Sequence, residues 1–146
     1  ILRKYKPHTV ILPFWKGRHP DQYTTPKLVY EACFLSGLKK IKQSGNAHRP
    51  FKILYSLAYH DTRPSFVVDI TDQFERKLKA IRAYSSQFVD LDGREEVPFT
   101  RTDIFEAIRV SNRHYGMMIQ KTFGEPFFMN ETMEIEDITQ LSVKSI

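Results

Sequence analysis

The succession of apolar and helical patterns in the sequence predicts an α/β protein with a layered fold and a mostly parallel sheet. Residues 9–15 form a nearly continuous apolar run, which is typical of a strand buried on both faces of a sheet, and we expect a central strand there. A helical pattern follows, and residues 51–59 then alternate as a second strand does. This strand–helix–strand order predicts a right-handed crossover between parallel strands.

The first helix is expected over residues 26–41. Thr24 and Thr25 can cap its start, and Pro26 suits the first helical position. Its apolar face repeats at helical spacing through Leu28, Val29, Ala32, Cys33, Leu35 and Leu38.

The rest of the chain repeats this organisation. Residues 65–70 are a third strand candidate, and a helix capped by Thr71 or Asp72 follows. Asp103 and Glu106 form a capping box for a further helix that ends by Gly124. Residues 125–130 then predict a short last strand. Residues 131–146 have the character of a surface tail.

Length and composition indicate one globular domain. The 146 residues are 41% hydrophobic, enough to build a core without disulfides or metal. Cys33 is the only cysteine, so neither an intrachain disulfide nor a Cys-based zinc site can form, which favours a cytoplasmic setting. No apolar run approaches the roughly 18 residues that a membrane helix needs, so we expect no membrane partner.

The charge is unevenly distributed along the chain. Residues 1–60 carry 11 Lys and Arg against 2 acidic residues, whereas residues 61–146 carry 11 against 15. The basic residues are scattered, with no aromatic platform or basic stripe, and therefore we expect no nucleic-acid partner. Those at Lys39, Lys40 and Lys42 can be explained by the carbonyl groups at a helix C-terminus, which favour cations.

The stretch GRHPDQ, residues 17–22, is the best candidate site because it follows the most apolar strand and precedes a helix. An Asp close to an imidazole fixes its tautomer and stabilises its charged form, as for His19 and Asp21 here. A fixed cationic donor stabilises the oxyanion that develops when water adds to a carbonyl group. Equally, both could be loop residues in which Pro20 and Asp21 provide turn chemistry.

Several stretches together carry a resemblance to a known family: RHPD, KLVYEACFLSGLKK, AHRP, SFVVDITDQFERKLKAIRAYSSQF and YGMMIQKTFGEPF. Over residues 4–128 the chain resembles the LmbE/PIG-L metal-dependent deacetylases, and most of all the N-acetylglucosaminyl-malate deacetylases of bacillithiol biosynthesis. The resemblance implies a Rossmann-like fold. It also implies removal of an acetyl group from an N-acetylglucosamine moiety, with zinc activating water and polarising the amide.

The resemblance also assigns roles to individual residues. The position of His19 is that of the residue that stabilises the oxyanion, and Asp21 is in the position of the carboxylate that orients it. Arg18 could bind an anionic part of the substrate, because its guanidinium suits a carboxylate, or could pack on the surface. Arg49, in AHRP, is a second substrate-contact candidate, or simply a loop residue before Pro50.

Two departures from the family pattern stand out. Gln22 occupies the position of a zinc-binding His, and an amide oxygen binds zinc less well than an imidazole nitrogen does. The family's N-terminal Ala-His-Pro-Asp-Asp stretch, which holds the other ligands and the general base, has no counterpart here. His19-Pro20-Asp21 is the sole His-Pro-Asp of this sequence. Among the other histidines we single out His60, beside Asp61, for which a structural or exposed role is expected.

These departures lead to one main hypothesis and one alternative. The main hypothesis is that the chain is the C-terminal part of a single deacetylase domain that lacks its N-terminal strands. Such a chain would be inactive alone, and its open sheet edge would need a partner segment or self-association. The alternative is a non-catalytic sugar-binding module that has lost its metal: Gln22 favours it, and His19 with Asp21 argues against it. Either way, the expected ligand is a small N-acetylated amino sugar.

Overall fold

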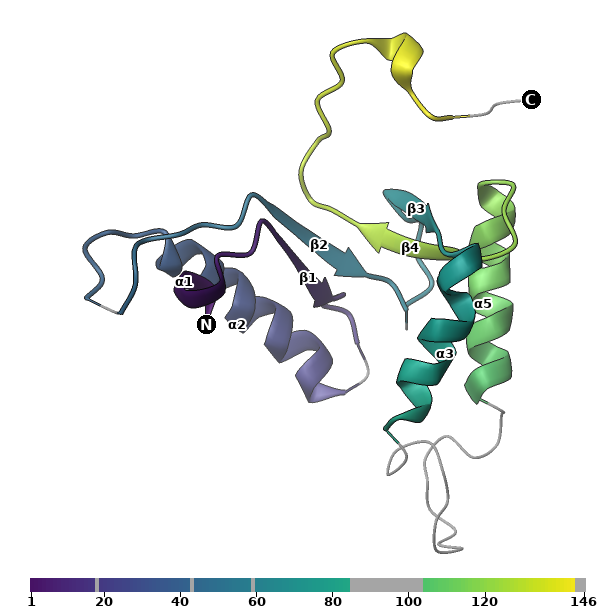
Figure 1. Ribbon diagram of the computed structural model, residues 1–146, viewed down its shortest axis with the longest axis horizontal. Helices are drawn as coiled ribbons and strands as arrows, with labels where there is room; N and C mark the ends of the chain where they lie inside the picture. The colour runs from purple at the N-terminus through teal and green to yellow at the C-terminus, as the bar shows by residue number, and fades with distance from the viewer. Residues whose placement is uncertain (18, 43, 59, 85–103, 144–146) are drawn as a thin grey trace, which may run out of the picture. The chain divides into compact units, whose positions relative to one another are not determined.

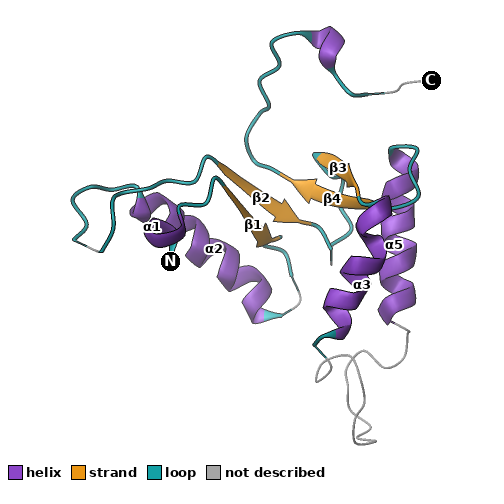
Figure 2. Ribbon diagram, in the orientation of Figure 1, coloured by secondary structure: helices purple, strands orange, loops and turns teal. Residues whose placement is uncertain are grey.

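The computed structural model describes residues 1–17, 19–42, 44–58, 60–84 and 104–143, and its architecture is mixed α/β, as the sequence predicts (Figures 1 and 2). The chain forms two compact units: residues 1–66 with 126–146, and residues 67–125. Four strands form one sheet in the order β1-β2-β4-β3, and the division between the units falls within β3 and within β4.

The sheet of the first unit contains both strand directions. β1 (Thr9–Pro13) pairs in parallel with β2 (Lys52–Ser56), with Leu12 opposite Tyr55. β2 pairs antiparallel with β4 (Gly124–Phe128), with Tyr55 opposite Phe128. The sheet is therefore mixed instead of mostly parallel, because the apolar pattern of a strand does not encode its direction.

Among the described residues β1 is an edge strand of the sheet, so the expectation of a central strand is wrong there. Leu12 and Phe14 are buried, whereas Ile11, on the opposite face, is 56% exposed. One face of β1 is thus covered and the other is open. The apolar run reflects burial of alternate residues and not burial on both faces.

The helix that follows, α2, spans Pro20–Ser36, so its predicted start at residue 26 is wrong by six residues. His19 is the N-cap and Pro20 occupies the first helical position, where a missing N–H costs nothing. Pro26 lies inside the helix and is buried. Residues 19–22 form a more complete start signal than Thr24 and Thr25, because two side chains there cap two backbone N–H groups.

α2 ends at Ser36 and not at the predicted residue 41, and α1 (Leu2–Tyr5) contacts this end of the helix. The guanidinium of Arg3 donates hydrogen bonds of 2.8 to 3.1 Å to the carbonyl oxygens of Ser36, Leu38 and Ile41. Arg3 is only 8% exposed. The sequence predicts that the lysines of residues 39–42 provide the cation at this helix end. In the structure the buried Arg3 of α1 binds the carbonyl groups.

One hydrophobic core fills the first unit between the sheet and α2. Leu12, Phe14, Tyr55 and Leu57 form its buried centre, and Val29 of α2 packs against them. An aromatic group extends it, in which the rings of Trp15 and Tyr55 meet edge to face at 4.8 Å, and Trp15, Phe14 and Phe128 also contact one another. These contacts fix the chain where β1 ends and the segment that leads to α2 begins.

The second unit packs two helices around its own aromatic core. β3 (Phe66–Asp69) leads through a 3-10 turn, η1 (Thr71–Gln73), into α3 (Phe74–Arg82), close to the predicted positions. The rings of Phe74 and Phe123 stack at 3.7 Å beside the fully buried Leu78. α5 (Ile104–Met118) follows the predicted helix, but Asp103 of its capping box lies outside the described residues.

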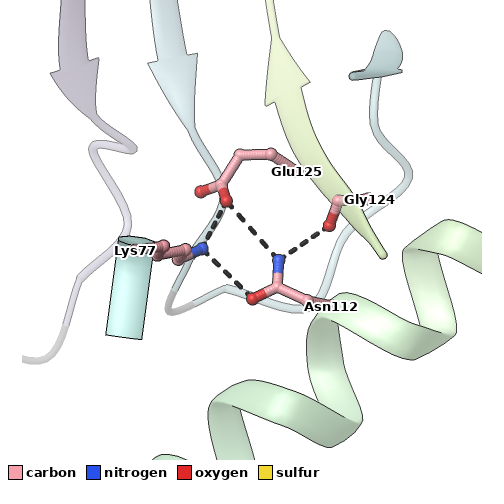
Figure 3. Close-up of polar contacts among 4 residues, drawn as sticks. All are labelled: Lys77, Asn112, Gly124 and Glu125. Carbon is pink, nitrogen blue, oxygen red and sulfur yellow. Dashed lines mark hydrogen bonds and ion pairs between the residues drawn. The ribbon is translucent and has the colours of Figure 1, made fainter. Parts of the chain in front are cut away.

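A polar network ties the helices of this unit to β4 (Figure 3). Lys77 of α3 pairs with Glu125 of β4 and donates to the side-chain oxygen of Asn112 at 3.1 Å. The Asn112 amide donates to the Gly124 carbonyl oxygen at 2.7 Å and to Glu125 at 3.5 Å. Asn112, which is 4% exposed, thus uses both ends of its side chain.

The segment after β4 contains one short 3-10 helix, η2 (Ile138–Gln140), and residues 131–143 are all exposed. Its assignment as a surface tail of a single domain stays a prediction. No helix in the described part of the chain is long and apolar enough to cross a membrane.

Candidate functional site

The candidate stretch forms the N-terminus of α2, where two side chains cap the helix reciprocally. His19 has extended backbone angles, and its Nδ1 accepts a hydrogen bond of 3.2 Å from the Asp21 N–H. The Gln22 Oε1 accepts one of 3.3 Å from the His19 N–H. This is a capping box in which His and Gln take the positions that Ser or Thr and Glu usually hold. The stretch is therefore the first turn of a helix and not a loop.

The capping bond determines which nitrogen of His19 carries a proton. Because Nδ1 accepts from Asp21, the proton of the neutral ring lies on Nε2, which is then a donor. The Asp21 Oδ2 lies 3.5 Å from the same Nδ1. Both side chains are well exposed, at 67% for His19 and 84% for Asp21. The imidazole thus presents an oriented donor to solvent at a helix N-terminus.

Gln22 has a structural role that its sequence position did not reveal. Its side chain caps the helix and packs so closely on Gly17 that a Cβ at residue 17 would collide with it. This contact explains why a glycine precedes the motif. The assignment of Gln22 to the metal position stays a prediction, but its oxygen is already an acceptor for a backbone N–H.

The zinc that the resemblance implies lacks a ligand set in this part of the chain. A catalytic zinc takes three protein ligands, and no group of three His, Cys, Asp or Glu that could hold a metal occurs among the described residues. Cys33 is buried, and desolvation raises the pKa of its thiol, so it stays protonated. The described residues therefore do not fit a zinc site.

A small cavity opens where β1 and β2 end, the usual ligand position in α/β sheets. It measures about 210 Å³ and is lined by Ile11, Leu12, Pro13, Phe14, Lys16, Gly17, Gln22, Ser56, Ala58 and His60. The ring of His60 stacks on Phe14, with centroids 5.0 Å apart and planes at 24°. The sequence singles out His60 but does not predict that it lines a cavity. The signal that could have shown this is its position directly after the second predicted strand.

Of the two arginine candidates, Arg18 lies outside the described residues, and Arg49 is not brought together with His19. The Arg49 Nη2 donates to the Phe34 carbonyl oxygen at 3.3 Å, and its guanidinium lies 4.7 Å from the Phe34 ring centre. Phe34 is about 21 Å along α2 from Pro20 at 1.5 Å per residue. Arg49 therefore borders a separate groove of about 940 Å³, and a substrate contact there stays a prediction.

Comparisons with known proteins relate this chain to deacetylases, although no family model matches it. Over 122 residues it is 30% identical to a diacetylchitobiose deacetylase of Thermococcus kodakarensis, covering 80% of this chain and 45% of that protein. The N,N'-diacetylchitobiose deacetylase of Pyrococcus horikoshii is similar in structure, with a TM-score of 0.63 and 31% identity over 86% of this chain and 46% of that one.

Two further solved structures share the fold. The conserved protein TT1542 of Thermus thermophilus matches with a TM-score of 0.76 and 28% identity, covering 92% of this chain and 57% of that one. The 4-carboxy-2-hydroxymuconate hydratase GalB of Pseudomonas putida matches with a TM-score of 0.71 at 16% identity, which shows likeness of fold alone; the match covers 94% of this chain and 57% of GalB.

The chain spans about half the length of the proteins that it matches. Over that half, the α/β fold and the sequence are similar to those of diacetylchitobiose deacetylases.

Proposed function

We propose that this chain is part of a LmbE/PIG-L-type deacetylase that removes an acetyl group from an N-acetylglucosamine-type substrate. The observation that carries the proposal is the oriented Nε2–H donor of His19, exposed at the N-terminus of α2 just after a parallel strand. The 30% identity to a diacetylchitobiose deacetylase supports the choice of reaction.

The chemistry requires a donor at this position. When water adds to the amide carbonyl carbon, negative charge develops on the carbonyl oxygen, and the Nε2–H of His19 stabilises it. Asp21 keeps the ring in the required tautomer, because its backbone N–H donates to Nδ1. A preorganised donor of this kind contributes about 100- to 1,000-fold to the rate. One proton of the attacking water passes to the amide nitrogen as the C–N bond breaks, and the acetic acid and amine that form separate as acetate and an ammonium group.

Further proposals concern the substrate, the location in the cell, the assembly and the metal. N-acetylglucosaminyl-malate is proposed as the substrate from the stretches that resemble bacillithiol-biosynthesis deacetylases. A cytoplasmic location is proposed because the single Cys33 is buried and free. Association with a further segment or a second copy is proposed because β1 offers an open edge in the described sheet. Zinc, if it takes part, would need ligands beyond the described residues.

A non-catalytic sugar-binding module is the second candidate. The observation that favours it is the capping bond of Gln22, which gives this residue a structural reason to be present without any metal. Such a module would bind the sugar and release no acetate.

Acetate release separates the two candidates. The test compares the full-length protein that contains this chain with its His19→Ser variant, using N,N'-diacetylchitobiose and N-acetylglucosaminyl-malate as substrates. Serine is a good N-cap, so the variant keeps the helix start and loses the ring donor. We expect kcat to fall about 100- to 1,000-fold with little change in KM.

Two results would contradict the proposal. One is equal kcat for the two forms, which would remove His19 from the reaction. The other is sugar binding by the full-length protein without any acetate release, which would establish the binding module. The 146-residue chain alone is expected to release no acetate.

A further inference from the structure

His60 is the one ring in the strand-end cavity that neither the fold nor the proposed reaction uses. It is half-buried, and its backbone N–H donates to the Leu57 carbonyl oxygen at 3.2 Å. Phe14 covers one face of its imidazole. Neither ring nitrogen has a hydrogen-bond partner among the described residues. Among the described residues, the ring is therefore held through its backbone and one face and not through its nitrogens.

The cavity walls combine apolar surface with a few polar groups. Leu12, Pro13 and Phe14 supply the apolar part. The polar lining residues are Lys16, Gln22, Ser56 and His60, and the Gln22 side-chain oxygen already accepts from the His19 N–H. A sugar ring has the matching character, since its C–H groups form apolar patches and its hydroxyl groups are arranged around the rim.

The volume limits what can enter. At about 210 Å³, the cavity is smaller than the roughly 300–1,000 Å³ typical of drug-sized ligand sites. It can accept one sugar ring, while a second ring of a disaccharide would remain outside.

We propose that His60 is a substrate-contacting residue that binds a single ring of an N-acetylated amino sugar in this cavity through its ring nitrogens. The inference rests on the proposed function, because it takes the substrate class from there. It goes further by assigning a second histidine, outside the HPDQ stretch, to sugar recognition.

The first test follows the imidazole itself. The full-length protein that contains this chain, labelled with ¹⁵N at its histidine rings, is titrated with N-acetylglucosamine and the ring resonances are recorded by NMR. We expect the ring nitrogens of His60 to shift in a saturable manner, while those of His114, an exposed histidine on α5, stay in place. Unshifted His60 resonances up to the solubility of the sugar would overturn the proposal.

The second test uses variants with matched controls. His60→Phe keeps a ring to stack on Phe14 and removes both nitrogens, and it should weaken sugar binding about tenfold, as expected for the loss of a hydrogen bond. His60→Gln retains a donor and an acceptor and should recover part of the affinity. His114→Phe should bind as the parent chain does. Equal affinity of parent and His60→Phe would also overturn the proposal.

These readouts measure binding and not turnover. If the full-length protein binds sugar through His60 but releases no acetate, the proposed deacetylase function is wrong and the role of His60 stands. If it releases acetate and His60→Phe binds sugar as tightly as the parent, the role of His60 is wrong and the deacetylase function stands.

Discussion

Two pairs of side chains, a His with an Asp and a Lys with a Glu, show how differently the two units use polar groups. In the first unit, His19 and Asp21 lie on the first turn of α2 and are 67% and 84% exposed. In the second unit, Lys77 and Glu125 are 25% and 17% exposed and share Asn112 as a hydrogen-bonding neighbour (Figure 3). The first pair faces water, and the second is enclosed by α3, α5 and β4.

In the proposed function the exposed pair serves the reaction, whereas the enclosed network serves stability. The side chains of Lys77, Asn112 and Glu125 bind one another and the Gly124 carbonyl group, so the network holds two helices to a strand. His19 uses only one nitrogen for capping and keeps Nε2 available. Burial makes the loss of one partner expensive, whereas exposure makes it cheap. Stability should therefore depend on the enclosed pair and activity on the exposed one.

The largest effect is expected from Glu125→Leu. This change leaves the ammonium group of Lys77 without its charged partner in a largely buried place, and removing one member of a buried pair costs about 3 to 5 kcal/mol. Since Lys77 keeps its bond to Asn112 and some exposure, we expect the lower end of that range. The measurement is the free energy of unfolding in urea.

The double variant Lys77→Met/Glu125→Leu controls for loss of shape. It removes both charges and keeps apolar chains of similar length, so it should recover most of the stability lost by Glu125→Leu. If both variants unfold as easily, packing and not the unpaired charge is responsible for the loss.

A middle-sized effect is expected from the helix cap. His19→Ala removes the acceptor for the Asp21 N–H, and the loss of an N-cap costs about 1 kcal/mol. His19→Ser should retain the stability of the parent chain, because serine is a preferred N-cap. Urea unfolding of the two variants gives the comparison. Equal stability of His19→Ala and the parent would show that the cap contributes nothing.

Most elements could be predicted from the sequence because their apolar patterns match the burial in the structure. Leu12 and Phe14 in the first strand, and Phe74 and Leu78 in the third helix, are buried as their spacing indicates. Strand direction and strand order could not be predicted, since both depend on pairing between distant segments. The start of α2 was misplaced because histidine is not among the usual N-cap residues.

The site was only partly predictable for the same reason. A His-Pro-Asp stretch between a strand and a helix located the candidate site, because position and chemistry are both local in sequence. The capping role of Gln22 depends on a side-chain contact with Gly17 and a backbone bond to residue 19, which spacing alone does not show. His60 joins the cavity through the pairing of β1 with β2, and that contact spans more than 40 residues of chain.

The smallest effect on stability is expected from Asp21→Asn, and it provides the strongest contrast with Glu125. The carboxylate lies 3.5 Å from the His19 ring but is 84% exposed, and exposed ion pairs are worth between zero and about 1 kcal/mol. The favourable placement of an acid on the first helical turn adds a few tenths of a kcal/mol at most in salt.

The matched control is Glu31→Gln, because Glu31 is an exposed acid further along α2. In urea unfolding we expect Asp21→Asn to lie within about 1 kcal/mol of that control, because the Asp21 N–H that His19 caps is a backbone group and survives the change. A loss comparable to that of Glu125→Leu would mean that the His19–Asp21 pair stabilises the fold as the buried network does, and the distinction between a structural and a functional pair would fail.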